Sequence, residues 1–319
     1  MPRGGAARGA AVSAQPLLSV RELVVDHRVP GGLFAAARGV VRAVDRVSFE
    51  LAAGETLGLV GESGCGKSTL ARALVGLLPW RSGAVRFAGI DVARARGAER
   101  SSVRRGMQLV FQDARGSLDP RQQVGAAIAE GLELHRLGDA KERRRRVAEL
   151  LEQVGLPAES AARWPHEFSG GQRQRIGLAR ALAVEPRVLL LDEPVAAQDR
   201  SVQAQLLNLL LELRERRGLA CLLISHDLEL VAQVSDRVAV MHLGELVEWG
   251  ASAELLARPR HPFTRALLAG AVRGEPPSPL APPPGCRFHP RCPQAVAGCR
   301  SEPPPEREAA PGHRYRCIE

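Results

Sequence analysis

The stretch Gly61-Glu-Ser-Gly-Cys-Gly-Lys-Ser-Thr69 decides the fold of this chain. Two glycines enclose four residues and are followed by lysine and serine, a pattern that predicts a loop cradling phosphate groups. The apolar run over residues 56–60 predicts a strand before this loop, and residues 70–78 have a helical pattern after it. In that order, backbone N–H groups and the N-terminus of a helix can surround an anion.

We expect this loop to bind ATP, because Lys67 would reach the β and γ phosphates and the Ser68 hydroxyl would bind Mg²⁺. A glycine-rich turn before a helix is the alternative, and the preceding strand argues against it. The residues predicted to contact the nucleotide here are Gly61, Glu62, Ser63, Gly64, Cys65, Gly66, Lys67, Ser68 and Thr69.

A second stretch, Val188-Leu-Leu-Leu-Asp-Glu193, places two carboxylates at the end of an apolar strand. Ligands of open α/β sheets bind at this end of the strands. We expect Asp192 to hold Mg²⁺, through water, and Glu193 to orient or deprotonate the attacking water.

Composition restricts the class of protein. Of the 319 residues, 45% are hydrophobic, which is enough to bury a core, and no apolar stretch is long enough to cross a bilayer. We therefore expect a cytosolic chain. The net charge of +9 comes almost entirely from arginine, which we attribute to a GC-rich genome rather than to a nucleic-acid surface, and we expect no nucleic-acid partner.

The order of the patterns predicts an α/β fold with a parallel sheet. Residues 1–16 are expected to be disordered, and residues 17–272 to form the main domain, with a helical subdomain inserted at about 113–177. Residues 273–319 combine a proline-rich linker with a small cysteine-bearing extension. The predicted strands are residues 57–60, 107–111, 188–191, 220–224 and 237–242.

The string Phe168-Ser-Gly-Gly-Gln172 is the most specific in the chain, and it resembles the signature of ATP-binding-cassette (ABC) ATPases. The resemblance implies a P-loop NTPase core that works as half of a nucleotide-sandwich dimer. In that dimer, Ser169, Gly170, Gly171 and Gln172, at a helix N-terminus, would bind the γ-phosphate held by the opposite subunit.

Further residues match the family pattern. Gln112, after a predicted strand, resembles the glutamine that senses Mg²⁺ and water, and His226 resembles the histidine that contacts the γ-phosphate. Asp199 matches a dimer-contacting aspartate, although Gln198 stands where the family commonly has leucine. The family's adenine-stacking aromatic residue is missing from residues 26–30, so His27 or Arg28 would stack instead.

Within the family, the chain resembles the ATPase subunits of oligopeptide, dipeptide and nickel importers. This implies a second, different ATPase subunit, two membrane permease subunits and an extracytoplasmic binding protein, with this chain at the cytoplasmic face of the bacterial inner membrane. Three alternatives remain open: an exporter ATPase, a soluble non-transport cassette protein, and a regulatory subunit that binds ATP without turnover.

Four cysteines gather near the C-terminus: Cys286, Cys292, Cys299 and Cys317. In a reducing cytosol four thiolates suit Zn²⁺ or an iron–sulfur cluster. The family resemblance favours a 4Fe-4S cluster. The alternatives are a zinc site that includes His289 and His313, or a loose tail with free thiols.

Overall fold

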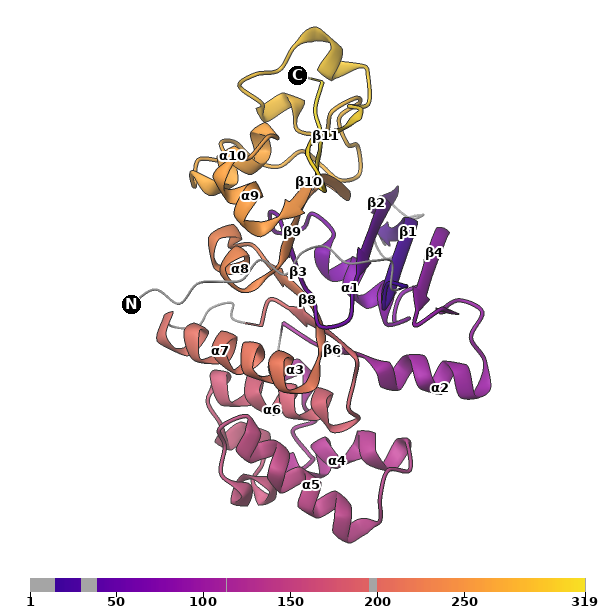
Figure 1. Cartoon of the computed structure of the whole chain (residues 1–319), viewed down its shortest axis with the longest axis vertical. Coiled ribbons are helices and arrows are strands. Elements are labelled where there is room, and N and C mark those ends of the chain that lie inside the picture. Colours follow the sequence, from indigo (N-terminus) through magenta and orange to yellow (C-terminus); the bar gives the residue numbers. More distant parts are fainter. Residues whose placement is uncertain (1–14, 30–38, 113, 195–199, 319) are drawn as a thin grey trace, which may run out of the picture.

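A computed structural model describes residues 15–29, 39–112, 114–194 and 200–318 of the chain. An eight-stranded sheet runs through its centre (Figure 1). The strands lie in the order β11 (Glu306–Ala310), β12 (His313–Arg316), β10 (Glu245–Ala251), β9 (Arg237–His242), β3 (Thr56–Val60), β8 (Ala220–Ser225), β7 (Val188–Asp192) and β6 (Met107–Val110).

The strands from β9 to β6 are parallel, so their carboxyl ends meet at one edge of the sheet. Strands β3, β7 and β8 are buried along their whole length, as continuous apolar runs in a parallel sheet should be. The predicted α/β class with a parallel core is therefore confirmed.

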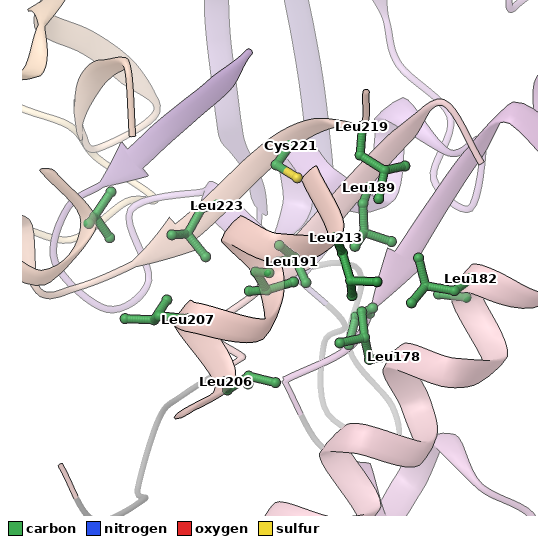
Figure 2. Close-up of a cluster of buried hydrophobic side chains, with 14 of the residues drawn as sticks. Leu178, Leu182, Leu189, Leu191, Leu206, Leu207, Leu213, Leu219, Cys221 and Leu223 are labelled. Carbon is green, nitrogen blue, oxygen red and sulfur yellow. The ribbon is translucent and has the colours of Figure 1, made fainter. Parts of the chain in front are cut away.

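Helices cover this core. Leu178 and Leu182 of helix α6 (Gly170–Ala183), together with leucines of helix α7 (Arg200–Arg217), pack against Leu189 and Leu191 of the sheet (Figure 2). Helix α8 (Leu228–Val234) follows β8, and helix α1 (Lys67–Leu74) follows β3.

A second sheet is antiparallel and was not predicted. Its order is β2 (Gly39–Leu51), β1 (Leu18–Val29), β4 (Ser82–Phe87) and β5 (Ile90–Asp91). Its apolar side chains share one core with helix α1 and the central strands. Helix α2 (Gly97–Gly106) then leads into β6.

Helical elements fill the sequence between β6 and β7, and helices α4 and α5 lie at the end of the molecule opposite the C-terminus (Figure 1). Helix α5 starts with a capping box, in which Asp139 accepts hydrogen bonds from the backbone of Lys141 and Glu142. Its apolar face, which includes Leu150 and Leu151, is buried. The elements are α3 (Ala114–Ser117), α4 (Val124–Leu134), α5 (Ala140–Gln153), η1 (Ala158–Ala162), η2 (Pro165–Glu167) and α6.

The C-terminal extension is packed onto the main sheet rather than separated from it. Strand β12 pairs antiparallel with β10, which makes the extension part of the central sheet. The buried carboxylate of Glu248 accepts hydrogen bonds from the backbone N–H groups of Arg260 and His261, and lies 2.7 Å from His313 Nε2. A carboxylate with three partners joins β10, β12 and the segment before helix α10 (Pro262–Leu268).

Aromatic side chains complete this attachment. His242, at the end of β9, packs against Phe263 of α10 and Phe288 of the extension, with ring centroids 4.4 and 5.5 Å away. Burial lowers the pKa of His242 to about 4, so the ring is neutral at pH 7. The remaining short elements are α9 (Ser252–Ala257), η3 (His289–Arg291) and η4 (Ala297–Arg300).

Candidate functional site

The predicted phosphate loop joins β3 to helix α1 at the carboxyl edge of the sheet. Gly66 caps α1 with φ +113°, and a Cβ there would lie 2.0 Å from the carbonyl oxygen of Ala43. A Cβ on Gly61 would lie 2.1 Å from the carbonyl oxygen of Met241. Both glycines are therefore required by the close approach of neighbouring backbone.

Lys67 is buried against the loop. Its Nζ donates hydrogen bonds to the carbonyl oxygens of Gly61, at 2.7 Å, and Glu62, at 2.9 Å. No acidic side chain lies in the first turn of α1, so the positive end of the helix dipole is not neutralised there. The loop, the helix end and the ammonium group together can bind a polyphosphate.

Ser68 links the two halves of the site. Its Oγ donates a hydrogen bond of 2.9 Å to Oδ1 of Asp192, which is 1% exposed at the end of β7. Within the described residues, Asp192 Oδ2 has no hydrogen-bond partner, and burial raises the pKa of this carboxyl. A buried carboxylate oxygen without a partner, next to a hydroxyl, is a donor set that suits Mg²⁺.

Glu193 has a strained backbone, with φ +46° in the left-handed region. Its Oε2 accepts a hydrogen bond from Gln112 Nε2 at 2.9 Å and lies 3.7 Å from His226 Nδ1. Gln112, Glu193 and His226 follow β6, β7 and β8 respectively, so the parallel register brings them together at one edge. Such a group can hold and polarise a water molecule.

The signature residues lie elsewhere on the molecule. Ser169 caps helix α6 and forms a capping box with Gln172, since each side chain binds the backbone N–H of the other. Ser169, Gly170 and Gln172 are exposed, and α6 lies well apart from α1 (Figure 1). The end of α6 therefore faces outward, available to a second molecule.

Comparison with known proteins agrees with this geometry. The chain matches the family "ABC transporter" over residues 44–196 and the family "Oligopeptide/dipeptide transporter, C-terminal region" over residues 247–299. It is 45% identical over 323 residues to the oligopeptide transport ATP-binding protein AppF of Bacillus subtilis, covering 96% of this chain and 98% of that one. The chain belongs to the ABC transporter family of ATPases.

Solved structures of ABC ATPases have the same fold. The dimeric ATP-binding cassette MJ0796, bound to ADP and Pi in a post-hydrolysis state, is 26% identical with a TM-score of 0.65, over 74% of this chain and 98% of that one. The cbiO1 protein of Clostridium perfringens, part of the ABC transporter complex cbiONQ, is 27% identical with a TM-score of 0.64, over 77% and 92%.

Some residues predicted for this ABC ATPase are not placed by the structure. Asp199 and Gln198 lie outside the described residues. His27 and Arg28 are exposed at the end of β1, and their predicted contact with adenine remains a prediction. In the described part of the chain, no helix has the length and apolar character needed to cross a bilayer.

The four C-terminal cysteines of the ABC ATPase line one cavity of about 240 Å³. Burial raises the pKa of Cys286 to about 11. Across the described ranges, however, no three His, Cys, Asp or Glu side chains are close enough together to hold a metal ion. His289 also lines the cavity, whereas His313 is paired with Glu248, which argues against the zinc alternative that uses His313.

One neighbour of the phosphate loop was not predicted from the sequence. Arg291, in the C-terminal extension, donates two hydrogen bonds to the carboxylate of Glu62. The two residues are 229 positions apart, and no motif in either segment indicates the pair.

Proposed function

We propose that this chain is the ATP-hydrolysing subunit of a peptide importer. The observation that supports ATP hydrolysis best is the meeting of Ser68, Asp192 and Glu193 at one sheet edge beside the phosphate loop. Peptide import is supported by the match of residues 247–299 to the oligopeptide/dipeptide transporter region and by the similarity to AppF.

Each residue of the site has a proposed role. Lys67 binds the β and γ phosphates, and Ser68, Asp192 and Gln112 hold Mg²⁺, which neutralises charge that develops on the phosphates. Glu193 orients the attacking water and accepts its proton, while His226 contacts the γ-phosphate. The hydrogen bond from Gln112 fixes the Glu193 carboxylate for this task.

The complete site needs a second cassette. We propose that the exposed N-terminus of α6, with Ser169, Gly170, Gly171 and Gln172, binds the γ-phosphate on the partner subunit, and that Asp199 takes part in the contact between the subunits. ATP between the subunits would favour the closed dimer, because it binds that state more tightly. The similar cassette MJ0796 was solved as a dimer.

The importer would contain further chains. We propose a different ABC ATPase as the dimer partner, two membrane permease subunits and an extracytoplasmic binding protein, with this chain at the cytoplasmic face of the inner membrane. The transported peptide contacts those other chains, so the site described here does not select it.

For the C-terminal cysteines, we propose a 4Fe-4S cluster held by Cys286, Cys292, Cys299 and Cys317. The support is that all four line one cavity, where the side chains would have to come closer together than they lie in this structure to hold the cluster. Burial raises the pKa of the Cys286 thiol to about 11, so this thiol would have to lose its proton in order to hold a metal.

Replacing Glu193 with glutamine tests the hydrolytic role. We expect Glu193→Gln to bind ATP with unchanged affinity. Its turnover rate should fall by a factor of about 10² to 10⁴, because a general base contributes that much to the rate. Steady-state hydrolysis by the assembled transporter and nucleotide titration measure the two quantities. The matched control is Glu215→Gln, at an exposed position of α7, and turnover equal to this control would refute the role.

Reconstitution tests the importer. We expect one different ABC ATPase and two membrane subunits to co-purify with the tagged chain when it is extracted from its native membranes in mild detergent. In proteoliposomes, ATP hydrolysis should rise when peptide-loaded binding protein is added on the side opposite the ATPases. A complex with two copies of this chain would contradict the proposed heterodimer, and stimulation only by peptide on the ATPase side would indicate an exporter.

Anaerobic purification tests the cluster. The protein should be brown and contain about four iron atoms per chain, and Cys292→Ser should lose colour and iron. Cys221→Ala, which changes a buried core cysteine outside the cavity, should keep both. Colourless protein with stoichiometric zinc would indicate a zinc site, and protein with neither metal would refute both metal sites.

A further inference from the structure

We propose that Arg291 of the C-terminal extension is a positioning residue for the phosphate loop and acts through Glu62. The inference rests on the proposed ATP site and adds a residue that lies outside the nucleotide-binding motifs. It makes the extension a structural part of that site.

The contact between Arg291 and Glu62 has the geometry of a strong pair. Arg291 Nη1 donates to Glu62 Oε2 and Nη2 donates to Oε1, both at 2.7 Å. The two side chains are 6% and 21% exposed. A bidentate, charge-assisted pair with so little access to water is specific in geometry and stronger than a surface ion pair.

Arg291 is itself held in place by the extension. Its Nε donates a 2.8 Å hydrogen bond to the carbonyl oxygen of Arg273, and its guanidinium lies 5.9 Å from the ring centre of Phe288. Phe288 is buried against Phe263 of α10, which anchors the segment to the main domain. Because these contacts fix the guanidinium, less freedom is lost when it binds Glu62.

In the described part of the chain, the carboxylate of Glu62 forms ion pairs with Arg291 and His242, and Arg291 is the member that is charged at neutral pH. The ring of His242 is nearby, with Nδ1 3.7 Å from Glu62 Oε2, but it is buried and uncharged above its lowered pKa. Of these two pairs, the one with Arg291 therefore supplies the full opposite charge to the Glu62 carboxylate.

Glu62 connects this pair to the phosphate-binding atoms. Its carbonyl oxygen accepts hydrogen bonds from Lys67 Nζ, at 2.9 Å, and from the backbone N–H of Cys65, at 3.3 Å. Holding the Glu62 side chain therefore fixes the turn that carries the lysine and the loop N–H groups.

The same segment supports the loop at a second point. Arg287 donates to the carbonyl oxygen of Leu243 and to the carboxylate of Asp45. The next residue after Leu243, Gly244, donates a 2.8 Å hydrogen bond to the carbonyl oxygen of Cys65. Arg291 thus contacts the loop directly through Glu62, and Arg287 contacts the segment whose Gly244 is hydrogen-bonded to the loop.

The expected consequence is a change in ATP affinity more than in catalysis. A loop ordered before ATP arrives loses less conformational freedom on binding, which strengthens binding. Loss of Arg291 leaves Glu193, Gln112 and His226 in place, so turnover at saturating ATP should change little. The expected kinetic result is a raised KM for ATP with a nearly constant kcat.

A double-mutant cycle on the full-length chain tests the proposal, with MgATP affinity measured by titration and kinetics measured in the assembled transporter. Arg291→Met and Glu62→Gln should each weaken MgATP binding about tenfold, and the double variant should be no weaker than either single variant. Arg291→Lys, which keeps the charge without the bidentate geometry, should recover part of the affinity. Hydrogen exchange of residues 61–69 without nucleotide should be faster in Arg291→Met.

The control is Arg300→Met, which changes an exposed arginine of the same extension and should leave affinity and exchange at wild-type values. Unchanged affinity in Arg291→Met, or losses that multiply in the double variant, would overturn the proposal. If Arg291→Met does not fold, Arg291→Lys replaces it. The cycle then consists of Arg291→Lys, Glu62→Gln and the variant that carries both changes. Wild-type protein that binds no MgATP would instead refute the ATP site itself.

Discussion

The hydrogen bond from Ser68 Oγ to Asp192 Oδ1 joins the two halves of the nucleotide site, and the rest of the site depends on it. It forms because β3 and β7 both pair in parallel with β8, so residues 124 positions apart reach the same sheet edge. That register also brings Gln112 and His226 to Glu193. The pairing of the apolar strands thus fixes the positions of the polar side chains at their carboxyl ends.

The site carries costs that the surrounding structure must offset. Asp192 is buried with one carboxylate oxygen that has no partner among the described residues, and Glu193 has a left-handed backbone. Each feature destabilises the protein without ligand by about 1–3 kcal/mol. The burial of β7 and β8 along their whole length stabilises the fold and offsets this destabilisation. The carboxylate oxygen without a partner can then bind a cation.

Much of this structure could be predicted from sequence because its signals are local. Continuous apolar runs predicted the parallel strands, and a glycine pattern between strand and helix predicted the loop around Lys67. The antiparallel sheet was missed, because β1 carries register shifts that break the simple alternation of a half-buried strand. The pairs Arg291–Glu62 and His313–Glu248 could not be predicted, since each joins distant segments that no motif connects.

We propose that Ser68 and Asp192 hold the divalent cation of a nucleotide site. Binding of Mn²⁺ to the protein with saturating ADP, followed by electron paramagnetic resonance, tests it most directly. Asp192→Asn should weaken Mn²⁺ binding about tenfold or more, as loss of a group around a metal does, while Asp119→Asn, at an exposed position, should not. Equal Mn²⁺ affinity in Asp192→Asn and wild type would contradict the account.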